Sequence, residues 1–143
     1  MNPYIQRAAE LIKKSEGLRL EAYKDVGGLL TIGYGHLLLK TEPFRRITQL
    51  EANALLEKDI EKADAVIQRY VKVPLKDTQR AAILSLIFNI GGGNFVKSTL
   101  LKKLNAGDYA AAAENFDKWV YVQSKIIPGL VKRRKEEKQI FLA

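Results

Sequence analysis

The chain has 143 residues, of which 47% are hydrophobic, and a formal net charge of +8 at neutral pH. This length corresponds to one ordinary domain, and the apolar fraction is enough for a sizeable core. There is no cysteine and only one histidine, so a disulfide framework, a thiolate metal site and a histidine-rich zinc site are excluded. We therefore expect any catalysis to rest on carboxylates, hydroxyls and amides.

The first predicted helix covers residues 3–16. Its apolar side chains Ile5, Ala9 and Ile12 recur at helical spacing, and Glu16 continues the same stripe at the carboxyl end. A carboxyl group in this position is partly desolvated and lies at the negative end of the helix dipole. Both effects favour the protonated form that a general acid needs. The alternative is a glutamate that simply turns out to solvent.

Residues 23–36 predict a small β-sheet that begins with a hairpin. Gly27-Gly28 is suited to a two-residue hairpin turn. Residues 30–34 then alternate between larger apolar side chains and other residues, which places Thr31 on the face opposite the larger apolar ones. Gly35 carries no side chain that could block a ligand lying on the strand.

The remainder of the chain predicts helices. A capping box at Thr48–Glu51 begins a long helix that ends at Pro74. The stretch Ala81–Ile90 is the most apolar in the chain, and it is too short to span a bilayer, so it indicates a buried helix. The other predicted helices cover residues 77–90, capped by Asp77 and stopped by Gly91-Gly92-Gly93, about residues 96–104, residues 108–119, capped by Asp108, and a last helix that begins at Pro128.

This order of elements predicts an α+β fold with two lobes. The small β-sheet lobe covers about residues 17–60, and the larger helical lobe covers about residues 1–16 and 72–143. The long helix joins them, and residues 1–143 form a single domain. Two lobes joined in this way leave a cleft between them, which is the usual site for an extended ligand.

Three polar residues around the predicted hairpin have a distinctive spacing. Eight residues separate Glu16 from Asp25, five separate Asp25 from Thr31, and Ile-Gly-Tyr-Gly-His follows. Two carboxylates in different environments are what acid/base cleavage of an acetal needs, because one must hold a proton while the other stays ionised. Taken alone, Asp25 could equally be an ordinary turn residue and Thr31 an ordinary strand residue.

The whole segment resembles the phage-type lysozymes, glycoside hydrolase family 24. That family's motif is Glu, eight residues, Asp, five residues and Thr, followed by Ile-Gly-x-Gly-His, and every position is present. The resemblance continues through Leu55–Asp59, Phe88–Gly91 and Pro128–Arg134, and it covers essentially the whole chain. It implies a lysozyme-like fold and an inverting hydrolysis of the β-1,4 bond between N-acetylmuramic acid and N-acetylglucosamine in bacterial peptidoglycan, without a cofactor.

The resemblance also implies roles for single residues. Glu16 would be the general acid, and Asp25 with Thr31 would hold the attacking water. Gly35 and Asn89 would contact the sugar, although Asn89 could also be a satisfied core amide. His36 and Asp59 would form a structural ion pair, with no catalytic role for the histidine. Of the run Lys132-Arg133-Arg134-Lys135, some residues would face the cleft and the catalytic glutamate, and the sequence leaves open which; a solvated face is the alternative.

The positive charge is concentrated in the second half of the chain. Residues 72–143 carry 13 Lys and Arg against 6 Asp and Glu. An anionic partner such as a wall polymer, a membrane surface or nucleic acid is one interpretation, and a merely soluble surface is the other. With the resemblance, we expect peptidoglycan as the partner, a monomer, no nucleic acid and no stable membrane insertion. The rival is a cationic wall- or membrane-binding protein on the same scaffold without catalysis.

The first 30 residues show no secretory signal, because no apolar run of seven or more occurs there. The resemblance then implies accumulation in the host cytoplasm and release through a separate membrane-hole protein.

Overall fold

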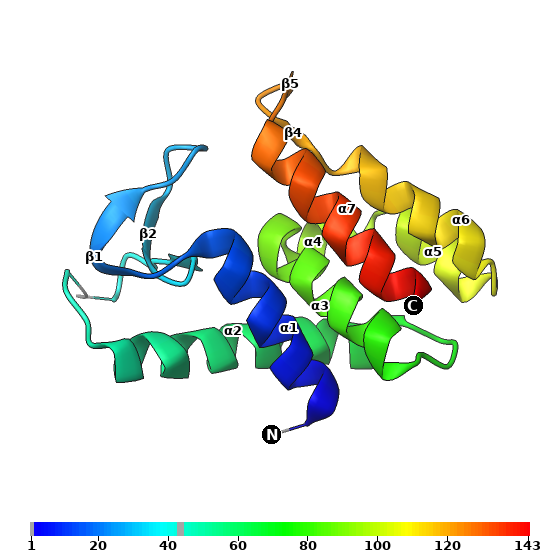
Figure 1. Cartoon of the computed structure of the whole chain (residues 1–143), viewed down its shortest axis with the longest axis horizontal. Helices are drawn as coiled ribbons and strands as arrows, with labels where there is room; N and C mark the ends of the chain where they lie inside the picture. The colour runs from blue at the N-terminus through cyan, green and yellow to red at the C-terminus, as the bar shows by residue number, and fades with distance from the viewer. Residues whose placement is uncertain (1, 43–44) are drawn as a thin grey trace.

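The computed structural model describes residues 2–42 and 45–143 (Figure 1). It confirms the predicted α+β class. The elements follow the chain in the order α1 (Pro3–Glu16), β1 (Arg19–Lys24), β2 (Leu30–Gly33), β3 (His36–Leu37), α2 (Gln49–Tyr70), α3 (Asp77–Ile90), α4 (Gly92–Val96), α5 (Thr99–Asn105), α6 (Tyr109–Asn115), the 3-10 helix η1 (Phe116–Lys118), β4 (Tyr121–Val122), β5 (Lys125–Ile126) and α7 (Pro128–Leu142).

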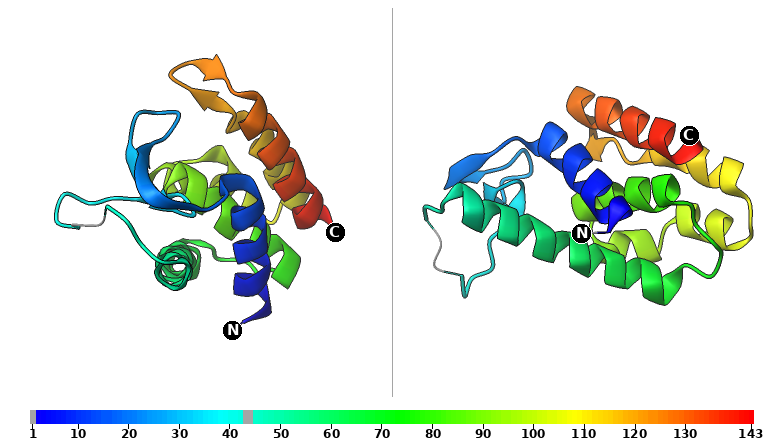
Figure 2. Two further views of the ribbon diagram at one scale, coloured as in Figure 1. Left: turned by 60° about the vertical axis from the view of Figure 1, so that its left-hand side comes forward. Right: turned by 60° about the horizontal axis from the view of Figure 1, so that its bottom comes forward.

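The small lobe holds an antiparallel sheet in the order β1-β2-β3. The long helix α2 runs from beneath this sheet to the helices of the larger lobe (Figure 1). Helix α3 lies at the centre of that lobe, in contact with α1, α2 and α7, and residues 81–87 are all buried. Figure 2 shows α7 on the side of α3 away from α2, whereas α1 contacts both α3 and α2. The two-lobed arrangement predicted from the sequence is therefore present.

Helix α1 has the predicted bounds. Pro3 is its first residue, where a missing N–H costs nothing, and Ala8 and Ile12 are its buried residues. Gly17 follows with a φ of +69°, a conformation that glycine adopts without strain. The turn from α1 into β1 therefore depends on Gly17, and it leaves Glu16 at the end of the helix.

The hairpin differs from its prediction in two ways. Strand β1 begins at Arg19, four residues earlier than expected. The turn has three residues, because the N–H of Asp25 donates to the carbonyl of Leu29 at 2.9 Å with residues 26–28 between them, so the two-residue turn is wrong. The expected alternation also fails at Leu30, which is exposed beside this turn although Ile32 is buried.

Helix α2 begins as predicted. The N–H of Glu51 donates to Oγ1 of Thr48 at 3.1 Å, and the N–H of Thr48 donates to Oε1 of Glu51 at 2.9 Å. The helix ends at Tyr70, before Pro74, because Val71 is already extended.

The helical lobe corrects three predicted boundaries. Asp77 is the first residue of α3 rather than its cap, and Gln79 accepts the N–H of Lys76 at 2.8 Å instead. The helix expected near residues 96–104 is α5, which begins only at Thr99 because Ser98 accepts the N–H of Leu101, and the short helix α4 in the predicted glycine stop was missed. Asp108 caps α6 as predicted, but α6 ends at Asn115 and continues as η1.

Candidate active site

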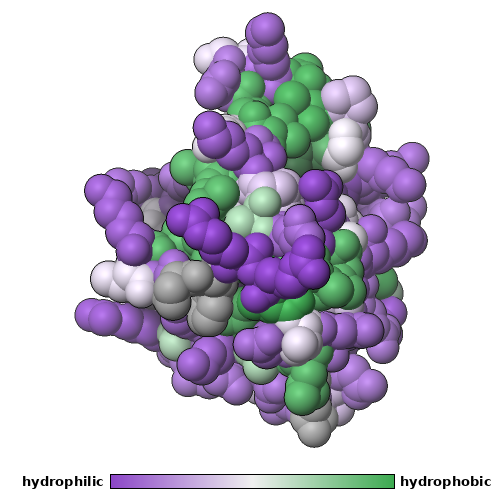
Figure 3. Space-filling view, turned by 90° about the vertical axis from the view of Figure 1, so that its left-hand side faces the viewer, coloured by the Kyte–Doolittle hydropathy of each residue, from purple (hydrophilic) through white to green (hydrophobic). Residues whose placement is uncertain are grey.

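A cleft of about 740 Å³ lies between the two lobes. It is bounded by the end of α1, the β1–β2 hairpin, the end of α3, the β4–β5 hairpin and the first turns of α7. Figure 3 shows the face that carries the small lobe, with apolar side chains gathered at the top over the β4–β5 hairpin and the start of α7. All five residues predicted to react with or bind the substrate line this cleft: Glu16, Asp25, Thr31, Gly35 and Asn89.

The carboxylate of Glu16 is held from two sides. Its Oε1 accepts a hydrogen bond from Nη1 of Arg133 at 2.9 Å, which links the end of α1 to α7. On the other side lies Gly35, which has a φ of +74°. A Cβ added to Gly35 would lie 2.7 Å from Cδ of Glu16 and closer still to Oε2, so only glycine leaves room for the carboxylate. The solvent-facing alternative for Glu16 is therefore wrong.

Asp25 and Thr31 are joined through the backbone of one residue. Oδ1 of Asp25 accepts the N–H of Leu29 at 2.8 Å, and Oγ1 of Thr31 donates to the carbonyl of Leu29 at 2.8 Å. Asp25 is thus a turn residue and a cleft residue at once. Thr31 is buried, and its fixed hydroxyl faces the same cleft as the carboxylates.

The sequence analysis missed Tyr23, which lies beside these groups on β1. Burial and then the charge of Glu16 raise the pKa of the Tyr23 phenol. The guanidinium of Arg19 lies 4.4 Å from the centre of the Tyr23 ring, a cation–π contact. A tyrosine four residues from an arginine on a short strand gives no sequence signal that separates it from ordinary packing.

Asn89 lies at the end of α3 with its amide oxygen engaged. Nη1 of Arg134 donates to Oδ1 of Asn89 at 2.8 Å and to the carbonyl of Trp119 at 3.3 Å. Because a guanidinium only donates, the oxygen of the amide must face Arg134. The amide is therefore satisfied and lies at the wall of the cleft, and its contact with a sugar stays a prediction.

The basic run at the start of α7 divides into buried and exposed residues. Arg133 and Arg134 are buried, with Arg133 facing Glu16, whereas Lys132 and Lys135 are exposed and Lys132 lines the cleft. The solvated-face alternative is wrong for the two arginines. Nε and Nη2 of Arg133 are buried and have no hydrogen-bond partner among the described residues.

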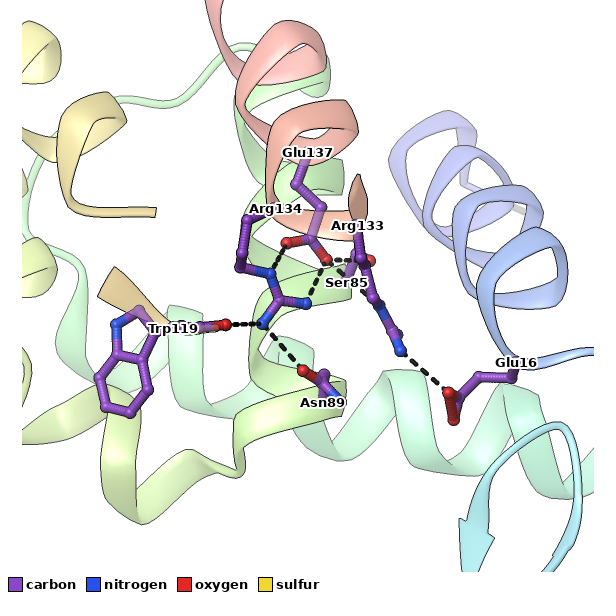
Figure 4. Close-up of polar contacts among 7 residues, drawn as sticks. All are labelled: Glu16, Ser85, Asn89, Trp119, Arg133, Arg134 and Glu137. Carbon is purple, nitrogen blue, oxygen red and sulfur yellow. Dashed lines mark hydrogen bonds and ion pairs between the residues drawn. The ribbon is translucent and has the colours of Figure 1, made fainter. Parts of the chain in front are cut away.

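A buried carboxylate joins the two arginines (Figure 4). Glu137 is 1% exposed; its Oε2 accepts from Oγ of Ser85 at 2.6 Å and from Nη2 of Arg134 at 3.1 Å, and it lies 3.6 Å from Nε of Arg133. Its Oε1 lies 2.6 Å from Nε of Arg134, as an ion-pair contact without the alignment of a hydrogen bond. Burial raises the pKa of Glu137 and lowers the pKa of Arg134, and their mutual attraction opposes both shifts.

The sequence carries a weak signal for this cluster. Glu137 lies four residues after Arg133 and three after Arg134, the spacing at which helical side chains meet, and Ser85 is a polar interruption in the apolar α3.

His36 lies behind the cleft, between two carboxylates. Its Nδ1 is 2.7 Å from Oδ2 of Asp59 on α2, and its Nε2 is 3.1 Å from Oε2 of Glu42, a partner that the sequence analysis missed. The hydrogen bond with Asp59 raises the pKa of His36, against the effect of burial. For Glu42, burial acts to raise the pKa, but the Leu39 N–H and His36 lower it overall.

Within residues 2–42 and 45–143, the acidic and histidine side chains form no cluster suited to hold a metal ion. None of the described helices combines the length and the apolar character needed to cross a bilayer.

The sequence of this chain is similar to those of known proteins. The family model described as phage lysozyme matches residues 13–137. The endolysin of Acyrthosiphon pisum secondary endosymbiont phage 1 is 46% identical over 140 residues, which are 95% of each chain. The SAR-endolysin of bacteriophage PS119 is 41% identical over 127 residues, covering 89% of this chain and 76% of the relative.

Solved structures with a similar fold include a phage endolysin and a muramidase domain. The endolysin from Escherichia coli O157:H7 phage FAHEc1 superposes with a TM-score of 0.84 at 35% identity, covering 96% of this chain and 91% of that one. The muramidase domain of SpmX from Asticaccaulis excentricus superposes with a TM-score of 0.84 at 34% identity, covering 95% of both chains.

Proposed function

Because this chain belongs to the phage lysozyme family, we propose that its cleft cleaves the β-1,4 bond between N-acetylmuramic acid and N-acetylglucosamine, with Glu16, Asp25 and Thr31 as the reacting groups. The chain is a glycoside hydrolase, and its substrate is peptidoglycan. The observation that carries the residue assignment is the cleft itself, into which Glu16 from α1 and Asp25 and Thr31 from the hairpin all open.

Glu16 is the general acid. It transfers its proton to the glycosidic oxygen as the bond from that oxygen to the anomeric carbon breaks, so the leaving sugar departs as a neutral alcohol. Arg133 donates to the carboxylate at 2.9 Å, and a fixed cation at this distance stabilises the negative charge that remains after the transfer. Gly35 confines the same carboxylate from the other side and leaves the sugar chain free to pass.

Asp25 is the general base. It takes a proton from the water that attacks the anomeric carbon, and Thr31 orients that water with its hydroxyl. The hydrogen bonds of both side chains to Leu29 fix them relative to each other. This arrangement gives inversion at the anomeric carbon, for which the two carboxyl groups must be about 6.5–9.5 Å apart. Asn89 contacts the bound sugar from the opposite wall.

We propose further that residues 1–143 act as a single catalytic domain and as a monomer. The relatives named endolysin and SAR-endolysin belong to phages, which supports a role in host lysis. In that role the protein accumulates in the host cytoplasm and reaches the wall through a separate membrane-hole protein.

The test compares wild-type protein with Glu16→Gln on purified bacterial walls. The substitution keeps the shape of the side chain and removes the acid, so we expect the rate of turbidity loss to fall by about 10²-fold or more. A Glu16→Gln protein that clears purified walls as fast as wild type would refute the role of Glu16, and one that fails to clear them but kills cells as fast as wild type would support the cationic binding protein without catalysis.

A further inference from the structure

Glu137 does not line the cleft itself, but it contacts Arg133 and Arg134, which bond to Glu16 and Asn89 on two walls of the cleft (Figure 4). On one side, Arg133 lies between Glu137 and Glu16, with 3.6 Å from its Nε to Glu137 and 2.9 Å from its Nη1 to Glu16. On the other side, Arg134 lies between Glu137 and Asn89, with 3.1 Å from its Nη2 to Glu137 and 2.8 Å from its Nη1 to Asn89.

Arg133, Arg134 and Glu137 are all buried, and together they carry two positive formal charges and one negative one. Arg134 and Glu137 are 0% and 1% exposed, so neither can exchange its partner for bulk water. Two buried guanidiniums side by side repel each other and need an anion between them. Glu137 is that anion, and Ser85 on α3 fixes its position through the 2.6 Å hydrogen bond.

We propose that Glu137 is a positioning residue for catalysis, which sets Glu16 through Arg133 and Asn89 through Arg134. The proposal rests on the roles given to Glu16 and Asn89 under the proposed function. Glu137 would then have two effects. Its negative charge offsets part of the positive charge that Arg133 presents to Glu16, and its position holds Arg134 against the amide of Asn89.

The charge effect predicts a change in the pH dependence of the reaction. Without the anion at residue 137, the charge of Arg133 acts on Glu16 alone and stabilises its ionised form, so the general acid loses its proton at lower pH. Arg133 and Arg134 from α7 face Glu137. The charged and titratable groups near Glu16 or in its cleft are Arg133, Arg134, Lys132 and Glu136 from α7, Lys14 from α1, and Arg19, Tyr23, Lys24 and Asp25 from the hairpin.

The first experiment measures kcat/KM against pH for Glu137→Gln on a soluble muropeptide chain. At an effective dielectric constant of about 20, removing the charge of a carboxylate on the far side of a guanidinium shifts the titration of the carboxylate on the near side by about one pH unit. We therefore expect the alkaline limb of the profile to move down by about one pH unit. Glu114→Gln is the matched control, because Glu114 is exposed and forms an ion pair with Lys138 of α7; its alkaline limb should not move.

The second experiment uses Arg134→Lys, which keeps the charge but cannot bond Glu137 and Asn89 with the same planar fork. We expect KM to rise several-fold while the alkaline limb stays in place. This variant keeps the proposal testable if Glu137→Gln does not fold, which circular dichroism establishes beforehand. A KM equal to that of wild type would then overturn the proposal.

Different results would overturn the positioning role of Glu137 and the proposed function. A folded Glu137→Gln protein with an unmoved alkaline limb overturns the positioning role, provided that Glu16→Gln is inactive in the same assay. An active Glu16→Gln protein instead overturns the proposed function from which the inference starts.

Discussion

Gly35→Ala is the substitution whose effect follows most directly from the geometry. The added Cβ would lie 2.7 Å from Cδ of Glu16 and closer to its Oε2, whereas a real Cβ keeps beyond 3.0 Å from such atoms. Because the obstacle is the end of a flexible side chain, the carboxylate moves rather than the backbone. It must retreat by about 1 Å, and a misplacement of this size costs about 10²-fold in rate.

The stability of Gly35→Ala should change much less than its activity. An alanine at positive φ costs about 1 kcal/mol, which lowers the melting temperature by roughly 3 °C in a chain of this size. Gly107→Ala is the matched control, because Gly107 has a φ of +79° and nothing within 4 Å of its added Cβ. It should lose a similar amount of stability and keep its full rate.

The assay is turbidity loss of purified walls at equal protein concentration, with melting temperatures by circular dichroism. Equal rates for Gly35→Ala and Gly107→Ala would refute the claim that Gly35 confines the carboxylate of Glu16. A Gly35→Ala protein that is inactive but also largely unfolded would place the role of Gly35 in the turn between β2 and β3 instead.

Two further predictions concern charge. The basic half of the chain should make lysis of whole cells fall steeply between 0.1 M and 1 M salt, as the screening length shrinks from about 10 Å to about 3 Å, while hydrolysis of a short neutral oligosaccharide changes little; equal sensitivity would contradict steering by charge. The pKa of His36 is raised by Asp59, so its contribution to stability is complete below about pH 6.5 and is lost as pH rises through the folded value. The pKa of Glu42 is lowered overall, so its contribution is present above about pH 4.3 and is lost as pH falls through the folded value. His36→Asn should therefore reduce the free energy of unfolding more at pH 5 than at pH 9 in urea titrations, and a cost independent of pH would contradict an ion pair.

Local signals in the sequence predicted the frame of the molecule well. The apolar stripe of residues 3–16 gave α1 with its bounds, and the capping box at Thr48 and Glu51 gave the start of α2, because both depend on residues within one turn of each other. The motif predicted Glu16, Asp25 and Thr31 as site residues, and all three line one cleft. The failed boundaries, such as the break at Ser98, depend on which of several competing caps the tertiary packing favours.

The contacts that hold the side chains of the site could not be predicted from local sequence patterns. Arg133 reaches Glu16 across 117 positions of the chain, and Ser85 reaches Glu137 across 52. Such pairs exist only because α1, α3 and α7 pack together, and that packing is not written in the spacing of either partner. The sequence therefore predicted which residues line the cleft and left open how their side chains are held.

The measurement that tests the mechanism most directly is the anomeric configuration of the first product, read by NMR before mutarotation. If Asp25 activates a water on the face opposite the proton donated by Glu16, the β-linked substrate gives an α-anomer. A β-anomer would show retention through a covalent intermediate, and it would contradict the role assigned to Asp25.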